Sequence, residues 1–171
     1  MKKLVHNREI KLRTFDLGDH ILLVEGILID HSQRFIRRSQ SSRGSKPVHH
    51  MTVRLKVRVP EMIIEEAQAT MPHRPREGCL EVLPGIGNLV GLKITKGYSM
   101  KVKELIGGTK GCAHLASLLT AMGPAAIQGY GAAHGEEVIP NLINTCYLWR
   151  EDGPIVRELR EGNKSKDSKT D

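Results

Sequence analysis

The chain has 171 residues, 39% of them hydrophobic and 26% charged, which is the balance of one globular domain. No apolar stretch approaches the length of a membrane span, and no signal peptide follows the basic N-terminus, so we expect a cytoplasmic protein with no membrane segment. The net charge of +7 is concentrated in residues 1–60, which hold 13 Lys and Arg against 5 Asp and Glu. This basic half could attract an acidic or phosphorylated partner.

The first third of the chain predicts β-structure. Residues 9–17 and 20–30 fit two strands joined by a turn at Gly18 and Asp19. The second of these segments is rich in branched apolar residues, and Gly26 within it indicates a bulge or a close backbone approach.

Residues 52–59 give the clearest strand, because apolar residues alternate with Thr52, Arg54, Lys56 and Arg58. The basic face of this strand, together with a basic, Ser-rich loop at 34–46, could bind phosphate groups. The interpretation that we favour is a solvated sheet face. In that interpretation the partners across the strands are Glu65 or Glu66.

Residues 62–70 fit a fourth strand or a helix. The chain after them predicts helices, and a short helix is expected at 79–83. Helical spacing of apolar residues is present in 97–106 and again after residue 112, where Gly123 and Pro124 should kink or split the helix.

These elements predict an α+β fold, in which an antiparallel sheet of three to four strands from the N-terminal third packs against C-terminal helices. We expect one domain over residues 8–160, a flexible N-terminus at 1–7 and a disordered polar tail at 161–171.

The segment Gly-Gly-Thr-Lys-Gly-Cys-Ala-His-Leu, residues 107–115, carries the strongest chemical signal. Cys112 follows glycines at a helix start, where the positive end of the helix dipole stabilises a thiolate. His114 lies two residues later, which is about 200° around a regular helix, so the two side chains can meet only if the first turn is irregular. This geometry argues against a simple Cys–His nucleophile pair and leaves room for a metal site that spans the helix start, or for His114 in a capping or packing role. Cys112 and His114 are nevertheless the candidate catalytic residues.

The chain contains three cysteines, too few and too widely spaced for a disulfide framework. Cys79, Cys112 and Cys146, together with His114, are ligand types that suit zinc or an iron–sulfur centre, so these four are also the candidate metal ligands. Buried structural thiols and a reactive thiol are the alternatives. His49 and His50 point to opposite faces of a strand, so only one of them could serve a given site, and the interpretation that we favour is polar residues at a strand entrance.

Several of these segments together resemble a bacterial family of proteins of unknown function, DUF2889. The resemblance covers roughly residues 8–159, and the residues that carry it are His49, Met51, Cys79, Gly111, Cys112, His114, Leu115, Gln128 and Cys146. Where that family has His-Asp-Met, this chain has His49-His50-Met51, so a role for an acid at that position is in doubt. The resemblance implies a bacterial, cytoplasmic protein and carries no activity with it.

Two hypotheses therefore remain open. The first is a metal- or thiol-dependent protein that uses the cysteine and histidine residues. The second is a non-enzymatic accessory or binding domain whose basic face contacts an acidic partner.

Overall fold

The computed structural model describes residues 1–32 and 47–167, so the basic loop expected at 34–46 lies outside the described residues. The strands are β1 (His6–Asp16), β2 (Ile21–Ser32), β3 (His49–Arg58) and β4 (Ile63–His73). The 3-10 helices are η1 (Glu77–Leu89), η2 (Gly108–Lys110) and η3 (Gly135–Val138). The α-helices are α2 (Tyr98–Ile106), α3 (Ala113–His134), α4 (Ile139–Leu142) and α5 (Pro154–Asp167).

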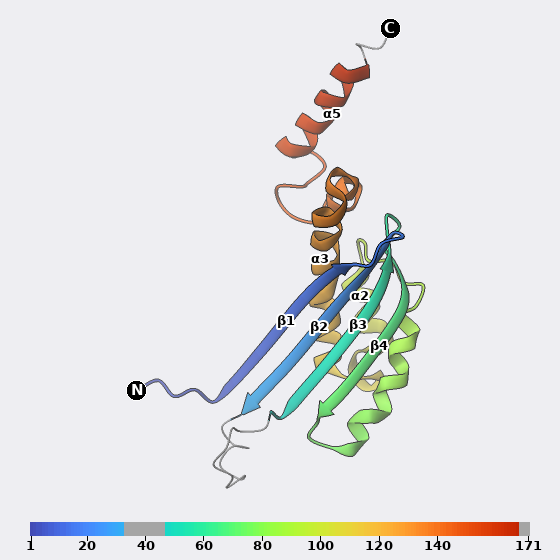
Figure 1. Ribbon diagram of the computed structural model, residues 1–171. Helices are drawn as coiled ribbons and strands as arrows, with labels where there is room; N and C mark the ends of the chain where they lie inside the picture. Colours follow the sequence, from blue (N-terminus) through green and yellow to red (C-terminus); the bar gives the residue numbers. More distant parts are fainter. Residues whose placement is uncertain (33–46, 168–171) are drawn as a thin grey trace.

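The four strands form one antiparallel sheet in the order β1-β2-β3-β4, so each strand pairs with its neighbour in the sequence. Helices η1, α2 and α3 lie against one face of the sheet, and the opposite face carries none of the described helices (Figure 1). The core lies between these two layers, with Val24, Leu55 and Ile64 fully buried in it. The predicted α+β fold, with an N-terminal antiparallel sheet against C-terminal helices, is confirmed.

Strand β4 resolves the ambiguity of residues 62–70, which form a strand and not a helix. Its glutamates pair with the basic face of β3: Lys56 donates to Glu66 at 2.8 Å, and Arg58 pairs with Glu65. Arg54 pairs with Glu25 on β2 at 2.8 Å. The cations on the exposed face of β3 therefore have carboxylate partners within the sheet, as the favoured interpretation predicted.

Gly26 marks a close approach between β2 and α3. The register of β2 is regular at this position on both sides, with Gly26 opposite Leu12 and opposite Val53, so there is no bulge. A Cβ at Gly26 would lie 2.7 Å from the sulfur of Met122 and 3.0 Å from a methyl of Leu118. The missing side chain allows α3 to pack directly on the middle of the sheet.

Helix α3 is one continuous helix of 22 residues with Pro124 inside it, so the predicted split is wrong. Proline removes one backbone N–H and with it one helical hydrogen bond. The residues on either side of it, Met122 and Ala126, are fully buried. Burial of the same helix face before and after Pro124 outweighs this local cost.

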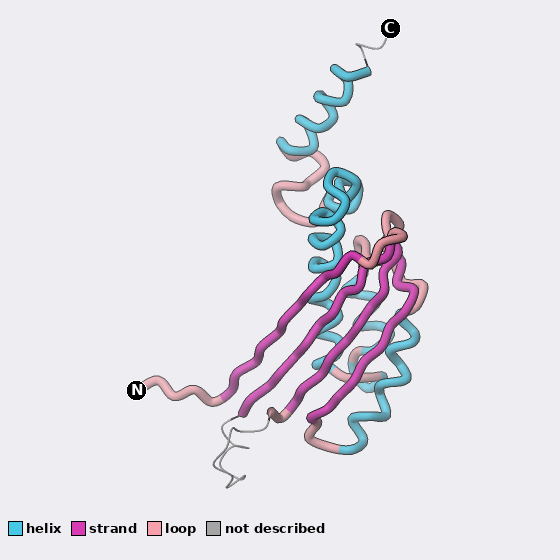
Figure 2. Tube along the Cα trace, in the orientation of Figure 1, coloured by secondary structure: helices cyan, strands magenta, loops and turns pink. Residues whose placement is uncertain are grey.

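The remaining elements extend the boundaries expected from the sequence. The short helix expected at 79–83 is part of η1, which continues through Pro84 to Leu89. Helix α5 runs to Asp167 and so includes the first residues of the tail for which disorder was expected, and it projects away from the sheet beyond the end of α3 (Figure 2). Within the described ranges, no helix has both the length and the apolar character that a bilayer crossing requires.

Candidate functional site

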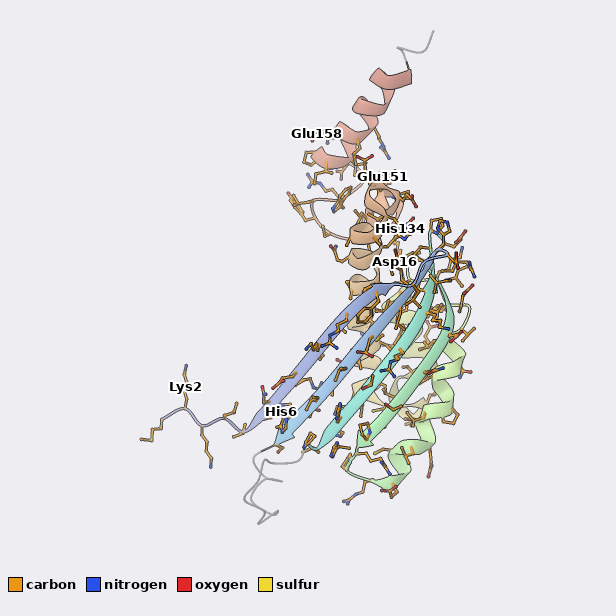
Figure 3. The ribbon with its side chains drawn as sticks, in the orientation of Figure 1. Lys2, His6, Asp16, His134, Glu151 and Glu158 are labelled. Carbon is orange, nitrogen blue, oxygen red and sulfur yellow. The ribbon has the colours of Figure 1, made fainter. Side chains whose placement is uncertain are left out.

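A row of polar side chains crosses three strands at the end of the sheet where β2 ends and β3 begins. The register pairs Arg8 on β1 with Asp30 on β2, and Asp30 with His49 on β3. His6, also at the start of β1, marks this end of the sheet in Figure 3. The first turn of α3 adds His114 to the row, and Cys112 directly precedes that helix. We refer to Arg8, Asp30, His49, Cys112 and His114 as the Asp30 cluster.

Asp30 is the centre of this cluster and is only 2% exposed. Its two carboxylate oxygens each accept a hydrogen bond of 2.7 Å from the guanidinium of Arg8. These charge-assisted bonds hold the pKa of Asp30 below its ordinary value of 3.8 and outweigh the opposing effect of burial. Asp30 is therefore an ionised carboxylate on the buried face of the sheet.

Two histidines approach the same oxygen of Asp30. The Nδ1 atom of His49 lies 3.2 Å from Oδ2, and the Nε2 atom of His114 lies 3.5 Å from it. The centroids of the two imidazole rings lie 3.9 Å apart, and the ring planes are tilted by 31° to each other. Burial lowers the pKa of His114 below its ordinary value of 6.5, the charges of His49 and Arg8 lower it further, and Asp30 acts in the opposite direction.

Cys112 contacts the other nitrogen of His114. Its Sγ atom lies 3.6 Å from Nδ1 of that ring. Cys112 is the N-cap of α3 and has extended backbone angles, φ −128° and ψ 124°, so it does not follow the helical path that would turn it away from His114. The irregular first turn that the pairing requires is therefore present.

The backbone before Cys112 is fixed by a tight turn. The amide of Cys112 donates to the carbonyl of Ile106 at 3.1 Å. A Cβ at Gly111 would lie 2.3 Å from that same carbonyl oxygen, so only glycine fits there without a shift of the backbone. This turn directs the thiol toward the sheet end that holds Asp30.

The structure brings together two of the four predicted ligands, Cys112 and His114. Cys79 lies in η1, which packs beside β4, and is half-buried. Cys146 is exposed and lies beyond α4, at the other end of α3 from Cys112, and a helix of that length spans about 33 Å. Among the described residues, the group of three or more ligand atoms within 4.8 Å of one another is Asp30, His49 and His114.

Sequence reasoning missed Asp30, Arg8 and the site role of His49. One signal for Asp30 is its place at the end of β2, in phase with the buried Leu22, Val24 and Leu28, because a carboxylate on a core face needs a charged partner. The signal for His49 is that it matches the family pattern. Arg8 gives no local signal, since only the register of β1 brings it to Asp30.

Comparison with known proteins agrees with the resemblance noted from the sequence. The family model described as Protein of unknown function (DUF2889) matches residues 6–128. This range includes every residue of the Asp30 cluster and ends before Cys146. No curated protein and no solved structure matches the chain.

Proposed function

The chain belongs to the DUF2889 family of proteins of unknown function, and we propose that it is a thiol-dependent protein in which Cys112 is the nucleophile and His114 its general base. In this proposal Asp30 orients the imidazole, and Arg8 holds the carboxylate in place. The reaction class is attack of a cysteine sulfur on an electrophilic centre. A nucleophile, a base and a group that orients the base recur together in enzymes of unrelated fold.

The observation that carries the proposal is that the two ring nitrogens of His114 face different partners. Nδ1 faces the sulfur of Cys112 at 3.6 Å, and Nε2 faces the carboxylate of Asp30 at 3.5 Å. An ionised carboxylate can only accept hydrogen bonds, so the nitrogen beside it carries the ring proton. The lone pair of the neutral ring then lies on Nδ1, toward the thiol.

This tautomer supports a simple proton transfer. Nδ1 takes the proton of the thiol, so the S–H bond breaks, an N–H bond forms and the sulfur is left as a thiolate. The sulfur then forms a bond to the electrophile, and the imidazolium returns its proton to the leaving group. Asp30 stabilises the imidazolium in between.

His49 and Arg8 act through their neighbours. The ring of His49 lies against that of His114 and restricts its rotation. Arg8 supplies two hydrogen bonds to Asp30 and balances its charge, which makes a buried carboxylate tolerable. Both are positioning residues in this proposal.

The proposal is tested by alkylation of the metal-free native protein with limiting iodoacetamide, followed by mapping of the adducts. We expect Cys112 to react first, although Cys146 is the more exposed thiol. His114→Gln should slow the alkylation of Cys112 by on the order of 100-fold, as expected for loss of a general base. Cys146→Ser should leave that rate unchanged.

A control variant separates loss of the base from a general loss of structure. His134→Gln changes a histidine at the far end of the same helix and should leave the alkylation rate of Cys112 within about twofold of wild type. If Cys112 reacts no faster than Cys79 and Cys146, or if His114→Gln has no effect on its rate, the proposed nucleophile is wrong.

A further inference from the structure

We propose that the Asp30 cluster also binds one divalent transition-metal ion of the zinc type through Asp30, His49 and His114. This proposal depends only on the positions of three ligand atoms, so it stands or falls separately from the proposed thiol function.

Two of the three ligand separations already suit a tetrahedral ion. Ligand atoms about 2.0–2.2 Å from a zinc ion lie about 3.3 Å from one another in a tetrahedron. Oδ2 of Asp30 lies 3.2 Å from Nδ1 of His49 and 3.5 Å from Nε2 of His114. All three ligand atoms lie within 4.8 Å of one another, so a small movement of the rings completes the set.

The donor types and their supports also fit such an ion. Two imidazoles and one carboxylate form the ligand set of zinc sites that keep a fourth position open. Asp30 and His49 lie opposite each other on adjacent strands, and Arg8 fixes the carboxylate by donating to both of its oxygens, including the ligand atom Oδ2. The His49 side chain is 16% exposed and that of His114 is 29% exposed, so an ion can reach them from solvent.

Cys112 lies beside this site and outside its ligand set. Its sulfur faces Nδ1 of His114 at 3.6 Å, whereas the ligand atom of that ring is Nε2.

His49 and Cys112 allow the metal site to be tested separately from the proposed thiol function. His49 is a ligand in the metal proposal and only a positioning residue for the thiol, whereas Cys112 is the nucleophile and not a ligand. His50 provides a matched control, because it is the next residue on the same strand and alternation points it to the opposite face of the sheet.

The binding experiment titrates Zn²⁺ into metal-stripped full-length protein against a competing chromophoric chelator. Wild type should bind one equivalent, and His49→Gln should weaken the affinity by at least about tenfold. His50→Gln and Cys112→Ser should stay within about threefold of wild type, and circular dichroism should report the same fold for all four proteins. No binding to wild type, or an equal loss in His49→Gln and His50→Gln, overturns the metal site, and a comparable loss in Cys112→Ser overturns the three-ligand assignment.

The alkylation of Cys112 in the metal-free protein keeps this site distinguishable from the proposed function. If one equivalent of Zn²⁺ binds to wild type and Cys112 shows no preferential reaction, the proposed thiol function fails and the metal site stands. If Cys112 reacts first and no zinc binds, the metal site fails and the thiol function stands.

Discussion

The two ends of α3 both carry a histidine, and their surroundings differ. At the N-terminal end His114 lies between a thiol and the buried carboxylate of Asp30. At the C-terminal end the ring of His134 lies 5.3 Å from that of Tyr130 and 6.0 Å from that of His20. The nearby Glu137 accepts a hydrogen bond from the hydroxyl of Tyr130, and among the described residues Nε2 of His134 has no hydrogen-bond partner.

The two histidines differ in their partners, since both ring nitrogens of His114 face a polar group and one of these groups is a buried carboxylate. Figure 3 shows the two ends, with His6 at one and Asp16 and His134 at the other. Acidic residues are present at the far end as well, but Asp16 and Glu137 are exposed. Among the described residues Asp30 is the buried carboxylate, because its strand position directs it into the core, where it pairs with Arg8 and His114.

The largest expected effect comes from Asp30→Asn, which leaves the guanidinium of Arg8 without its carboxylate. Asp30 is buried and the Arg8 side chain is 34% exposed, so removing the carboxylate should cost about 2–3 kcal/mol of unfolding free energy, below the full cost of breaking a buried ion pair. The matched change at the other end, Glu137→Gln, alters an exposed carboxylate and should cost less than about 1 kcal/mol. Urea denaturation measures both, and equal costs would contradict the central role of Asp30.

A smaller effect is expected from the glycines that flank α3. Gly111→Ala forces a Cβ against the carbonyl of Ile106 and should cost about 1–3 kcal/mol of stability. Gly135→Ala, at a residue with φ 62° and open space around it, should cost a similar amount through backbone strain. Only Gly111→Ala displaces Cys112, so only that variant should slow its alkylation. A slower rate in both variants would show that the reactivity of Cys112 depends on overall stability and not on the local turn.

The smallest effect is the pH dependence of stability, measured with metal removed by chelator. Because the pKa of His114 in the folded protein lies below 6.5, the unfolded chain binds more protons just below that pH, and stability should fall as the pH drops through this window. Asp30, whose pKa lies below 3.8, adds a second fall at lower pH. His114→Gln should remove the first fall, and His134→Gln should retain it. A wild-type profile that stays flat just below pH 6.5 would refute the lowered pKa of His114.

Local sequence patterns were enough to predict the sheet and the start of the helix that follows the thiol. Alternation of apolar and polar residues along 52–59 is a local property of a strand with one buried face, and the burial of residues along β3 alternates in the same way. The cross-strand partners of Lys56 and Arg58 followed from the charges of β4. The glycines before Cys112 likewise marked a helix start, because they allow a turn that other residues cannot adopt.

Tertiary structure alone decided the composition of the Asp30 cluster and the continuity of α3. Arg8, Asp30 and His49 form one row because of strand register, and His114 joins them because α3 packs across the sheet at Gly26. These are contacts between residues far apart in sequence, so no local pattern encodes them. For the same reason the spacing of the cysteines could not reveal that the segment between α4 and α5, which holds Cys146, lies beyond the C-terminal end of α3 (Figure 1). The burial that holds α3 together across Pro124 likewise exists only once the helix has a sheet to pack against.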